Sequence, residues 1–245
     1  MPPHSHPITL AGEDLQLLTD RAVHWPARRT LVIADVHLGK AAAFGHGGLP
    51  LGRGLIDATT EHDLRRLTES LARTRAERLI ILGDLLHAPA SREPRTLELV
   101  AHWRSSVATL HIDLIRGNHD RQAGDPPAEW RIDCHAPGRR DGPFALHHEP
   151  VDDSDEHALC GHIHPGIRLR GLGDDGGTLP CFVIGERRSI LPAFGTFTGS
   201  ARNFPHDGDR LFAVGPENLF EIAPYAPRVA RPASRARPPH PAQPR

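Results

Sequence analysis

The sequence has almost no lysine, few cysteines and no long apolar segment. Lys40 is the only lysine among 29 basic residues. The three cysteines, Cys134, Cys160 and Cys181, form no C-x-x-C pair, which excludes a zinc knuckle or a disulfide framework and is typical of a reducing compartment. No apolar run reaches the roughly 20 residues of a membrane span, and residues 1–6 lack the pattern of a signal peptide. We therefore expect a cytoplasmic protein.

A strong positive charge is also missing. The net charge is −1 at pH 7, and removing the five arginines of the acid-free segment 224–245 leaves −6 for residues 1–223. This balance argues against a broad basic face for nucleic acid. The chain has 245 residues and is 38% hydrophobic, which suffices for one large domain. We expect residues 1–223 to form it and the Pro/Arg-rich residues 224–245 to be a disordered tail.

Several hydrolase and nucleotide-binding motifs are absent, namely H-E-x-x-H, G-x-S-x-G and G-x-x-x-x-G-K-[ST]. His62-Asp63 resembles the H-D dyad of phosphohydrolases, but the surrounding pattern predicts that it lies on the polar face of a helix. Histidine, in contrast, is abundant, with 18 residues. Neutral imidazole is a common metal ligand, so the positions of the histidines decide whether this count has a meaning.

The first half of the chain alternates apolar strands with amphipathic helices, which predicts an α/β fold. Strands are predicted at residues 30–34, 78–82 and 112–115, and helices at 57–75 and 94–110. The first 30 residues are predicted to form a short strand or hairpin at the edge, and the glycine-rich residues 41–54 a loop. Beyond residue 130 the predicted elements are short strands at 144–146, 157–160, 167–170, 181–184, 211–214 and 219–222. They predict a second, more antiparallel sheet packed on the first.

Five polar clusters each follow an apolar strand, where α/β sheets place their functional sites. The clusters are Asp35-Val36-His37, Gly83-Asp84, Gly117-Asn118-His119-Asp120, His147-His148-Glu149-Pro150 and Gly161-His162-Ile163-His164. Each is weak alone, but five in this order indicate a metal site. A carboxylate such as Asp84 can bridge two ions about 3.5–4 Å apart. Mixed nitrogen and oxygen ligands suit Mn, Fe, Zn or Ni.

These clusters resemble the sequence blocks of the calcineurin-like metallophosphoesterase superfamily, which are D-x-H, G-D, G-N-H-D/E, H and G-H-x-H. A closer resemblance, over nearly the whole chain to about residue 223, is to the bacterial ligase-associated DNA damage response endonuclease family. It is carried by RAVHWP at 21–26, ADVHLGK at 34–40, LGDLLH at 82–87, GHIHP at 161–165 and LPAFGTFTG at 191–199. This chain departs from the family at Gly45-His46, because the family tends to carry Arg after Phe44.

The resemblance implies an α/β fold of two mixed β-sheets packed as a sandwich and flanked by helices (α/β/β/α). It also implies two divalent metal ions, with Mn favoured. One ion would be held by Asp35, His37, Asp84 and His164, and the other by Asp84, Asn118, His148 and His162. His148 is favoured over His147 because His148-Glu149-Pro150 matches the family's H-x-P. His119 would be the general acid, and Asp120 would either orient it or cap the following helix.

Further residues are candidates for lining the site. Lys40 and His87 are predicted substrate contacts, although Lys40 also fits a solvated loop. The segment Phe194–Gly199 is either a second loop over the site or a glycine turn with core phenylalanines. The arginine tail would at most add a nonspecific phosphate contact.

The predicted function is a metal-dependent phosphodiesterase with endonuclease activity on single-stranded or structured DNA. The resemblance implies a role in DNA repair with a DNA ligase and a helicase as partners. One alternative is a small-molecule or nucleotide phosphatase or phosphodiesterase, which the charge of −6 over residues 1–223 favours. Another is a non-catalytic metal-binding scaffold of a repair complex, against which the intact His119 argues.

Overall fold

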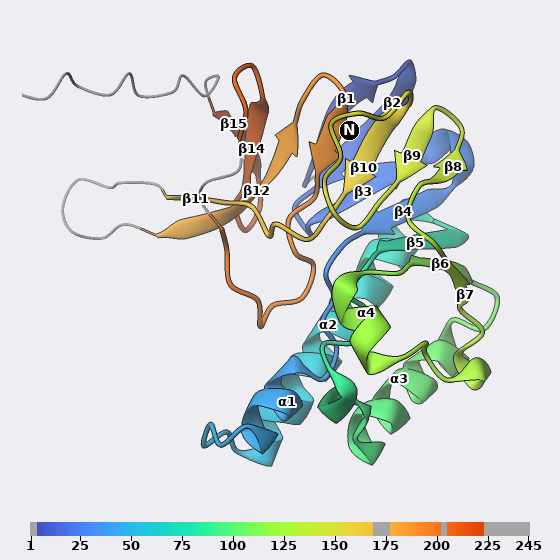
Figure 1. Ribbon diagram of the computed structural model, residues 1–245, viewed down its shortest axis with the longest axis vertical. Helices are drawn as coiled ribbons and strands as arrows, with labels where there is room; N and C mark the ends of the chain where they lie inside the picture. The colour runs from blue at the N-terminus through green and yellow to red at the C-terminus, as the bar shows by residue number, and fades with distance from the viewer. Residues whose placement is uncertain (1–3, 169–176, 202–204, 223–245) are drawn as a thin grey trace, which may run out of the picture.

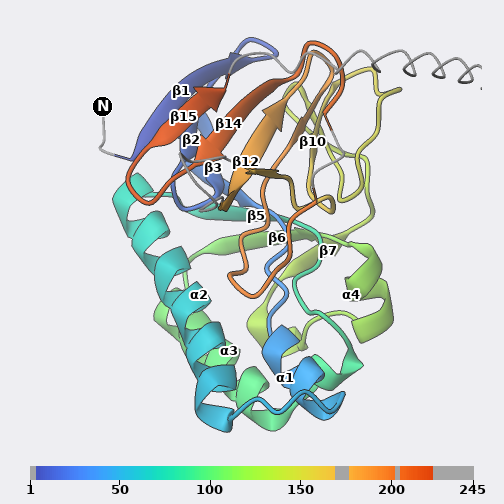
Figure 2. The same cartoon turned by 90° about the vertical axis from the view of Figure 1, so that its left-hand side faces the viewer.

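The computed structural model describes residues 4–168, 177–201 and 205–222 (Figure 1). Two mixed β-sheets pack face to face, and the α-helices of the described residues lie together on one side of them (Figures 1 and 2). The predicted α/β sandwich of two mixed sheets flanked by helices is confirmed, but among the described residues the helices form a single layer, on the side of the first sheet. The predicted tail, residues 224–245, lies outside the described residues.

The first sheet has seven strands in the order β1-β2-β3-β4-β5-β6-β7. They are β1 (Ser5–Leu10), β2 (Glu13–Leu18), β3 (Ala22–Trp25), β4 (Thr30–Ile33), β5 (Arg78–Leu82), β6 (His111–Ile115) and β7 (Asp133–His135). The pairs from β1 to β4 are antiparallel and those from β4 to β7 are parallel. The parallel part carries the predicted strands, and its carboxyl ends open toward the site. The strand β7 was not among the predicted elements.

The second sheet has eight strands, with the path β15-β14-β12-β13-β10-β9-β8 and β11 beside β12. They are β8 (Arg139–Asp141), β9 (Phe144–Leu146), β10 (His157–Cys160), β11 (Gly166–Arg168), β12 (Thr178–Ile184), β13 (Arg188–Ile190), β14 (Arg210–Val214) and β15 (Leu219–Ile222). As predicted, most pairs are antiparallel, but β10 is parallel to both β9 and β13. The strands β8 (Arg-Arg-Asp) and β13 (Arg-Ser-Ile) were not predicted, because neither contains an apolar run.

The helices are α1 (Lys40–His46), α2 (Arg53–Thr74), α3 (Pro94–Ser106) and α4 (Asn118–Ala123), with short 3-10 turns at Pro26–Arg28, Pro89–Arg92 and Ala128–Trp130. The prediction of a loop over residues 41–54 is wrong in part, because α1 and the first turn of α2 lie there. Three consecutive alanines favour helix in α1 despite the surrounding glycines. Of the helices described, none is long and apolar enough to cross a membrane.

The strands of the first sheet alternate between two cores, as their period of two requires. Leu31 and Ile33 of β4 face α2 and α3, where they pack with Leu64, Leu67 and Trp103. Val32 and the following Ala34 face the second sheet and pack with Phe144, Phe182 and Phe212. Both faces of β4, β5 and β6 are thus buried, which anchors the loops that follow their carboxyl ends.

Asp113 of β6 forms a buried ion network between the two sheets. Its carboxylate accepts hydrogen bonds from Arg78 Nε at 2.7 Å, from His135 Nε2 at 2.7 Å and from Arg139 Nη1 at 2.9 Å. Burial alone would raise the pKa of Asp113, but hydrogen bonds from Arg78 and His135 lower it overall. The negative charge is thus required to compensate the two guanidinium groups.

We expect Asp113→Ala to destabilise the fold by about 1–3 kcal/mol, because it removes the buried acceptor that Arg78, His135 and Arg139 share. Urea unfolding followed by circular dichroism measures this loss. Asp133→Ala is the matched control, since this carboxylate is 64% exposed and its removal is expected to cost at most about 1 kcal/mol. Equal stability of the two variants would contradict the prediction. The stability that Asp113 contributes is fully present above the pKa that its carboxyl has in the unfolded chain. It is lost as the pH falls through the lower pKa of the same carboxyl in the folded protein.

Candidate metal centre

The five predicted clusters meet at one end of the sheets, in the loops that follow β4, β5, β6, β9 and β10. Five of their residues have left-handed backbone conformations: Asp35, His37, Asp84, His162 and His164, with φ between 50° and 70°. The side chains therefore converge through turns and not by alternation along a continuing strand. Asp and His enter this region more readily than most residues.

Glycine allows the loops to approach each other closely. A Cβ on Gly83 would lie 2.1 Å from Nδ1 of His148, and one on Gly117 would lie 2.2 Å from Oδ1 of Asp84. Gly83 also has φ of 80°, which L side chains rarely adopt. These two glycines of the G-D and G-N-H-D clusters thus make room for candidate ligands.

The first candidate ligand group consists of Asp35, His37 and His164, whose ligand atoms all lie within 4.8 Å of one another. The Nε2 atoms of His37 and His164 are 3.2 Å apart, and Oδ1 of Asp35 is 3.4 Å from Nε2 of His164. This Oδ1 is buried and has no hydrogen-bond partner among the described residues, whereas Oδ2 accepts the backbone N–H of His162. An unpartnered buried carboxylate oxygen facing two imidazole nitrogens fits a cation.

The second candidate group consists of Asp84, His148 and His162, with Asn118 beside them. His148 donates its Nδ1–H to the carbonyl of Leu82, which directs Nε2 toward Oδ1 of Asn118 at 2.9 Å and Nδ1 of His162 at 3.1 Å. Such a bond fixes the ring and its tautomer, as is usual for metal-binding histidines. His148 is fully buried in the cluster, whereas His147 is only half-buried and belongs to neither group.

Asp84 lies between the two groups. Its Oδ2 is 3.7 Å from Nε2 of His37 and 3.4 Å from Nε2 of His148. Burial would raise the pKa of Asp84, but contact with His148 lowers it to about 2. Burial lowers the pKa of His37 to about 2, so this imidazole is neutral and offers a lone pair. Burial disfavours the charged form of His148, but the carboxylates of Asp84 and Asp35 outweigh it and raise the pKa of this histidine to about 9. A bound cation would replace that proton, because ligands bind metals in their deprotonated forms.

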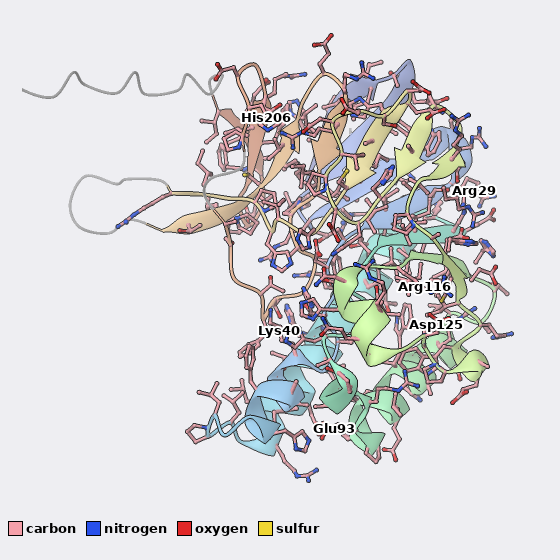
Figure 3. All side chains as sticks on the ribbon, viewed as in Figure 1. Arg29, Lys40, Glu93, Arg116, Asp125 and His206 are labelled. Atoms are coloured by element: carbon pink, nitrogen blue, oxygen red, sulfur yellow. The ribbon has the colours of Figure 1, made fainter. Side chains whose placement is uncertain are left out.

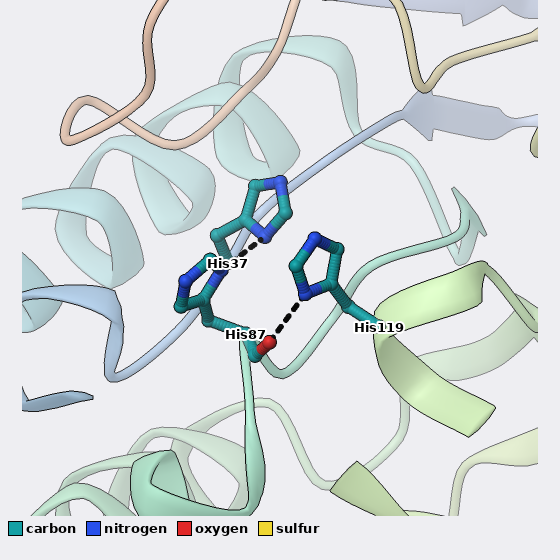
Figure 4. Close-up of side chains that lie close together, drawn as sticks. All are labelled: His37, His87 and His119. Atoms are coloured by element: carbon teal, nitrogen blue, oxygen red, sulfur yellow. Dashed lines mark hydrogen bonds between the residues drawn. The ribbon is translucent and has the colours of Figure 1, made fainter. Parts of the chain in front are cut away.

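His37 of the first group also lies close to two further histidines, His87 and His119 (Figure 4). Nδ1 of His87 is 3.2 Å from Nδ1 of His37, and the rings of His87 and His119 are stacked with centroids 4.6 Å apart. His119 donates its Nδ1–H to the carbonyl of His87 at 2.5 Å. Its other nitrogen, Nε2, is consequently free to face the centre and lies 4.0 Å from Oδ2 of Asp84.

Of the two roles expected for Asp120, the contacts of its carboxylate match the cap of the following helix. Its Oδ2 accepts the backbone N–H groups of Asp84 at 2.7 Å and of Gly117 at 2.9 Å, and its Oδ1 accepts those of Leu85 and Leu86. Among the described contacts, none joins its carboxylate to the ring of His119. Asp120 thus caps α4 and braces the loop that carries Asp84.

Lys40 is the first residue of α1 and lies between this helix and the sheets in the view of Figure 3. Burial lowers its pKa, while the charges of Asp35 and Asp84 raise it, so Lys40 lies within electrostatic reach of both carboxylates. His87 is half-buried beside His37. The structure therefore brings both predicted substrate contacts to the rim of the candidate metal centre.

The segment Phe194–Gly199 was expected to be either a second loop over the site or a glycine turn with core phenylalanines, and it has features of both. Phe194 is fully buried, and its N–H donates to the carbonyl of Ala34, while Gly195 N–H donates to that of Asp35. The segment is held from the other side by Asp63 of α2, which accepts the N–H of Thr196 at 3.1 Å.

The expectation that Asp63 belongs to the polar face of its helix is therefore wrong. Its side chain is buried, whereas that of the adjacent His62 is exposed. Asp63 lies 133 residues from Thr196 in the chain, and no local sequence signal announces such a contact. Asp63 and Phe194–Thr196 thus form a support for the backbone that carries Asp35.

We expect Gly195→Ala to reduce both stability and metal binding. The added Cβ would lie 2.2 Å from the carbonyl oxygen of Val36 and would displace the loop that carries Asp35 and His37. Overpacking of this kind costs about 1–3 kcal/mol. Gly199→Ala is the matched control, since its Cβ would meet no atom within 4 Å. Thermal unfolding and titration with Mn test the pair, and equal behaviour of the two variants would contradict this account.

This chain is similar to known proteins in sequence. The family model for calcineurin-like phosphoesterases matches residues 28–198. The crystal structure of Pseudomonas putida nuclease MPE is 45% identical, has a TM-score of 0.78, and aligns with 89% of this chain and 100% of that one. The structure of Yfce, a phosphoesterase from E. coli, is 17% identical with a TM-score of 0.40, over 79% of this chain and 98% of that one. A search of curated proteins gave no match. Since the family model spans all five clusters, the chain belongs to the calcineurin-like phosphoesterase family.

Proposed function

We propose that this chain is a dinuclear metal-dependent phosphodiesterase that acts as an endonuclease on single-stranded or structured DNA. The observation that carries the proposal is the position of Asp84, whose Oδ2 faces both histidine-containing groups. One carboxylate shared by two ligand sets is the arrangement that a two-ion site requires. Similarity over the full length of a nuclease supports a nucleic acid as the substrate.

In this proposal, Asp35, His37, Asp84 and His164 hold one ion, and Asp84, Asn118, His148 and His162 hold the other. Two divalent ions, when bound, lower the pKa of water and compensate the charge of a phosphate under in-line attack. Mn is the proposed metal, and Fe, Zn and Ni also suit the mixed nitrogen and oxygen ligands.

His119 is the proposed general acid. Its Nδ1–H is held by the carbonyl of His87, so a proton on Nε2 would face the centre and could be given to the leaving alkoxide. Asp120 positions the loop of Asp84 and does not exchange protons with the substrate. Lys40 and His87, at the rim, would contact the phosphates beside the cleaved bond.

The cellular setting is also a proposal. The motifs resemble the ligase-associated endonuclease family, which suggests DNA repair in the cytoplasm alongside a DNA ligase and a helicase. A small-molecule phosphatase is the competing function, because residues 1–223 carry a net charge of −6 and offer little general attraction to long DNA.

The test is an assay of purified protein with Mn on four substrates: bis-p-nitrophenyl phosphate, p-nitrophenyl phosphate, single-stranded DNA and duplex DNA. We expect cleavage of the diester and of single-stranded DNA, with about two Mn ions bound per chain. Cleavage of the monoester alone would support the phosphatase, and no cleavage with bound metal would support a scaffold. A single bound ion would contradict the shared role of Asp84.

A further inference from the structure

Exposed hydrophobic side chains lie on and after α1, and one of them, Phe44, borders the candidate metal centre. In the part of the chain that the structure describes, four large hydrophobic side chains are strongly exposed, and three of them lie between residues 44 and 55. These are Phe44, Leu49 and Leu55, which are 42%, 49% and 52% exposed. They lie on α1, on the connection that follows it, and on the first turn of α2, at the end of the molecule away from the sheets (Figure 1). Clustered exposed apolar side chains mark binding surfaces.

Phe44 connects this surface to the candidate metal centre. Its ring centroid is 5.7 Å from that of His87, which is itself in contact with His37. The ring of Phe197 is also near Phe44, with centroids 6.0 Å apart and an angle of 61° between the rings. Nζ of Lys40 lies 6.0 Å from the centroid of Phe44. An exposed aromatic ring, a second ring and a cation therefore border the cluster of histidines shown in Figure 4.

We propose that Phe44 and Phe197 form a stacking platform for an unpaired nucleobase of the strand whose phosphate lies at the metal centre. This inference rests on the proposed function and specifies how the site would select single strands. Bases of a duplex are paired and covered by their neighbours, whereas an unpaired base offers its face to an aromatic ring. Lys40 would contact a phosphate of the same nucleotide.

The negative net charge of the protein favours base stacking as a source of affinity for DNA. With a net charge of −6 over residues 1–223, a broad attraction to phosphates is weak, and base stacking compensates for it without sequence preference. Phe44 is in ring contact with His87 at the rim of the candidate metal centre. A base stacked on Phe44 would therefore belong to the same strand as the phosphate at the centre.

The test compares a single-stranded oligothymidine with an abasic strand of the same length and charge. For the wild-type protein with Mn, we expect kcat/KM to be higher on the strand with bases. Stacking of one base corresponds to about 5- to 150-fold, and Phe44→Ala is expected to remove this preference. Phe44→Trp should retain it, whereas Phe44→Leu, which keeps apolar area without a ring, should not. Loss in Phe44→Leu thus separates stacking from simple apolar contact.

Phe220→Ala is the matched control, because Phe220 is 52% exposed on β15 of the other sheet. An unchanged preference in Phe44→Ala, or an equal change in Phe220→Ala, would overturn the inference. Binding of fluorescent strands to the His119→Ala protein with Mn repeats the comparison without hydrolysis. If the wild-type protein cleaves no strand, the proposed function fails, and the ratio of the two dissociation constants still decides whether the platform exists.

Discussion

The variant Asp84→Asn is expected to abolish metal-dependent hydrolysis of every substrate. Asparagine keeps the size of the side chain and a carbonyl oxygen that can accept the N–H of His119, as Oδ1 of Asp84 does at 3.0 Å. It removes the charge that faces both ligand groups, and therefore weakens the binding of both ions. Since bound ions contribute several kcal/mol to charge stabilisation, we expect kcat/KM to fall about 10³-fold or more.

Metal analysis and kinetics on bis-p-nitrophenyl phosphate and single-stranded DNA measure this effect. The matched control is Asp125→Asn, whose carboxylate is 53% exposed and paired with Arg116 outside the site. It should retain its metal and its activity. An Asp84→Asn protein that binds two Mn ions and hydrolyses both substrates would show that the shared carboxylate is not required.

The variant His119→Ala is expected to separate substrates by their leaving group. Cleavage of DNA expels an alkoxide that needs a proton, and general acid catalysis contributes about 10²- to 10⁴-fold. We expect a loss of this size on single-stranded DNA. The p-nitrophenolate ion is stable without a proton, so hydrolysis of bis-p-nitrophenyl phosphate should fall far less. Asp84→Asn, in contrast, is expected to reduce both reactions alike.

His102→Ala, an exposed histidine of α3, serves as the control for His119→Ala. The number of bound metal ions should stay the same in both variants, since His119 lies outside the two ligand sets. An equal loss on DNA and on the nitrophenyl diester would indicate that His119 acts on binding or on the shape of the centre. Full activity on both substrates would remove His119 from the mechanism.

The elements that could be predicted are those whose pattern of apolar residues in the sequence matches the burial of their faces in the fold. The strands β4, β5 and β6 are short apolar runs because both of their faces are covered. The polar residues that follow them had to meet, since parallel strands end at one edge of a sheet. The structure brings all seven predicted ligand residues together there, although their roles stay predictions.

Contacts between distant segments gave no local signal. Asp63 reads as the polar face of a helix, and its burial depends on Thr196 in a loop of the other half of the chain. Helix α1 has only seven residues, which is marginal for an isolated helix. Its glycine N-cap, Gly39, packs against Ser91, so that a Cβ there would lie 2.7 Å from that of Ser91. Tertiary packing therefore supports a helix that the glycine-rich sequence disfavours.

The candidate ligands hold the backbone in a conformation that few residues adopt readily. Non-glycine residues in this conformation cost about 1–3 kcal/mol each, and five of them adjoin one another here: Asp35, His37, Asp84, His162 and His164. Glycine would relieve the backbone at each position but supplies no ligand atom. At Asp35 and Asp84 it would also leave the N–H groups of His162 and His119 without their acceptors. The strain of these five positions is therefore tied to the chemistry of the centre, and packing elsewhere in the fold has to offset it.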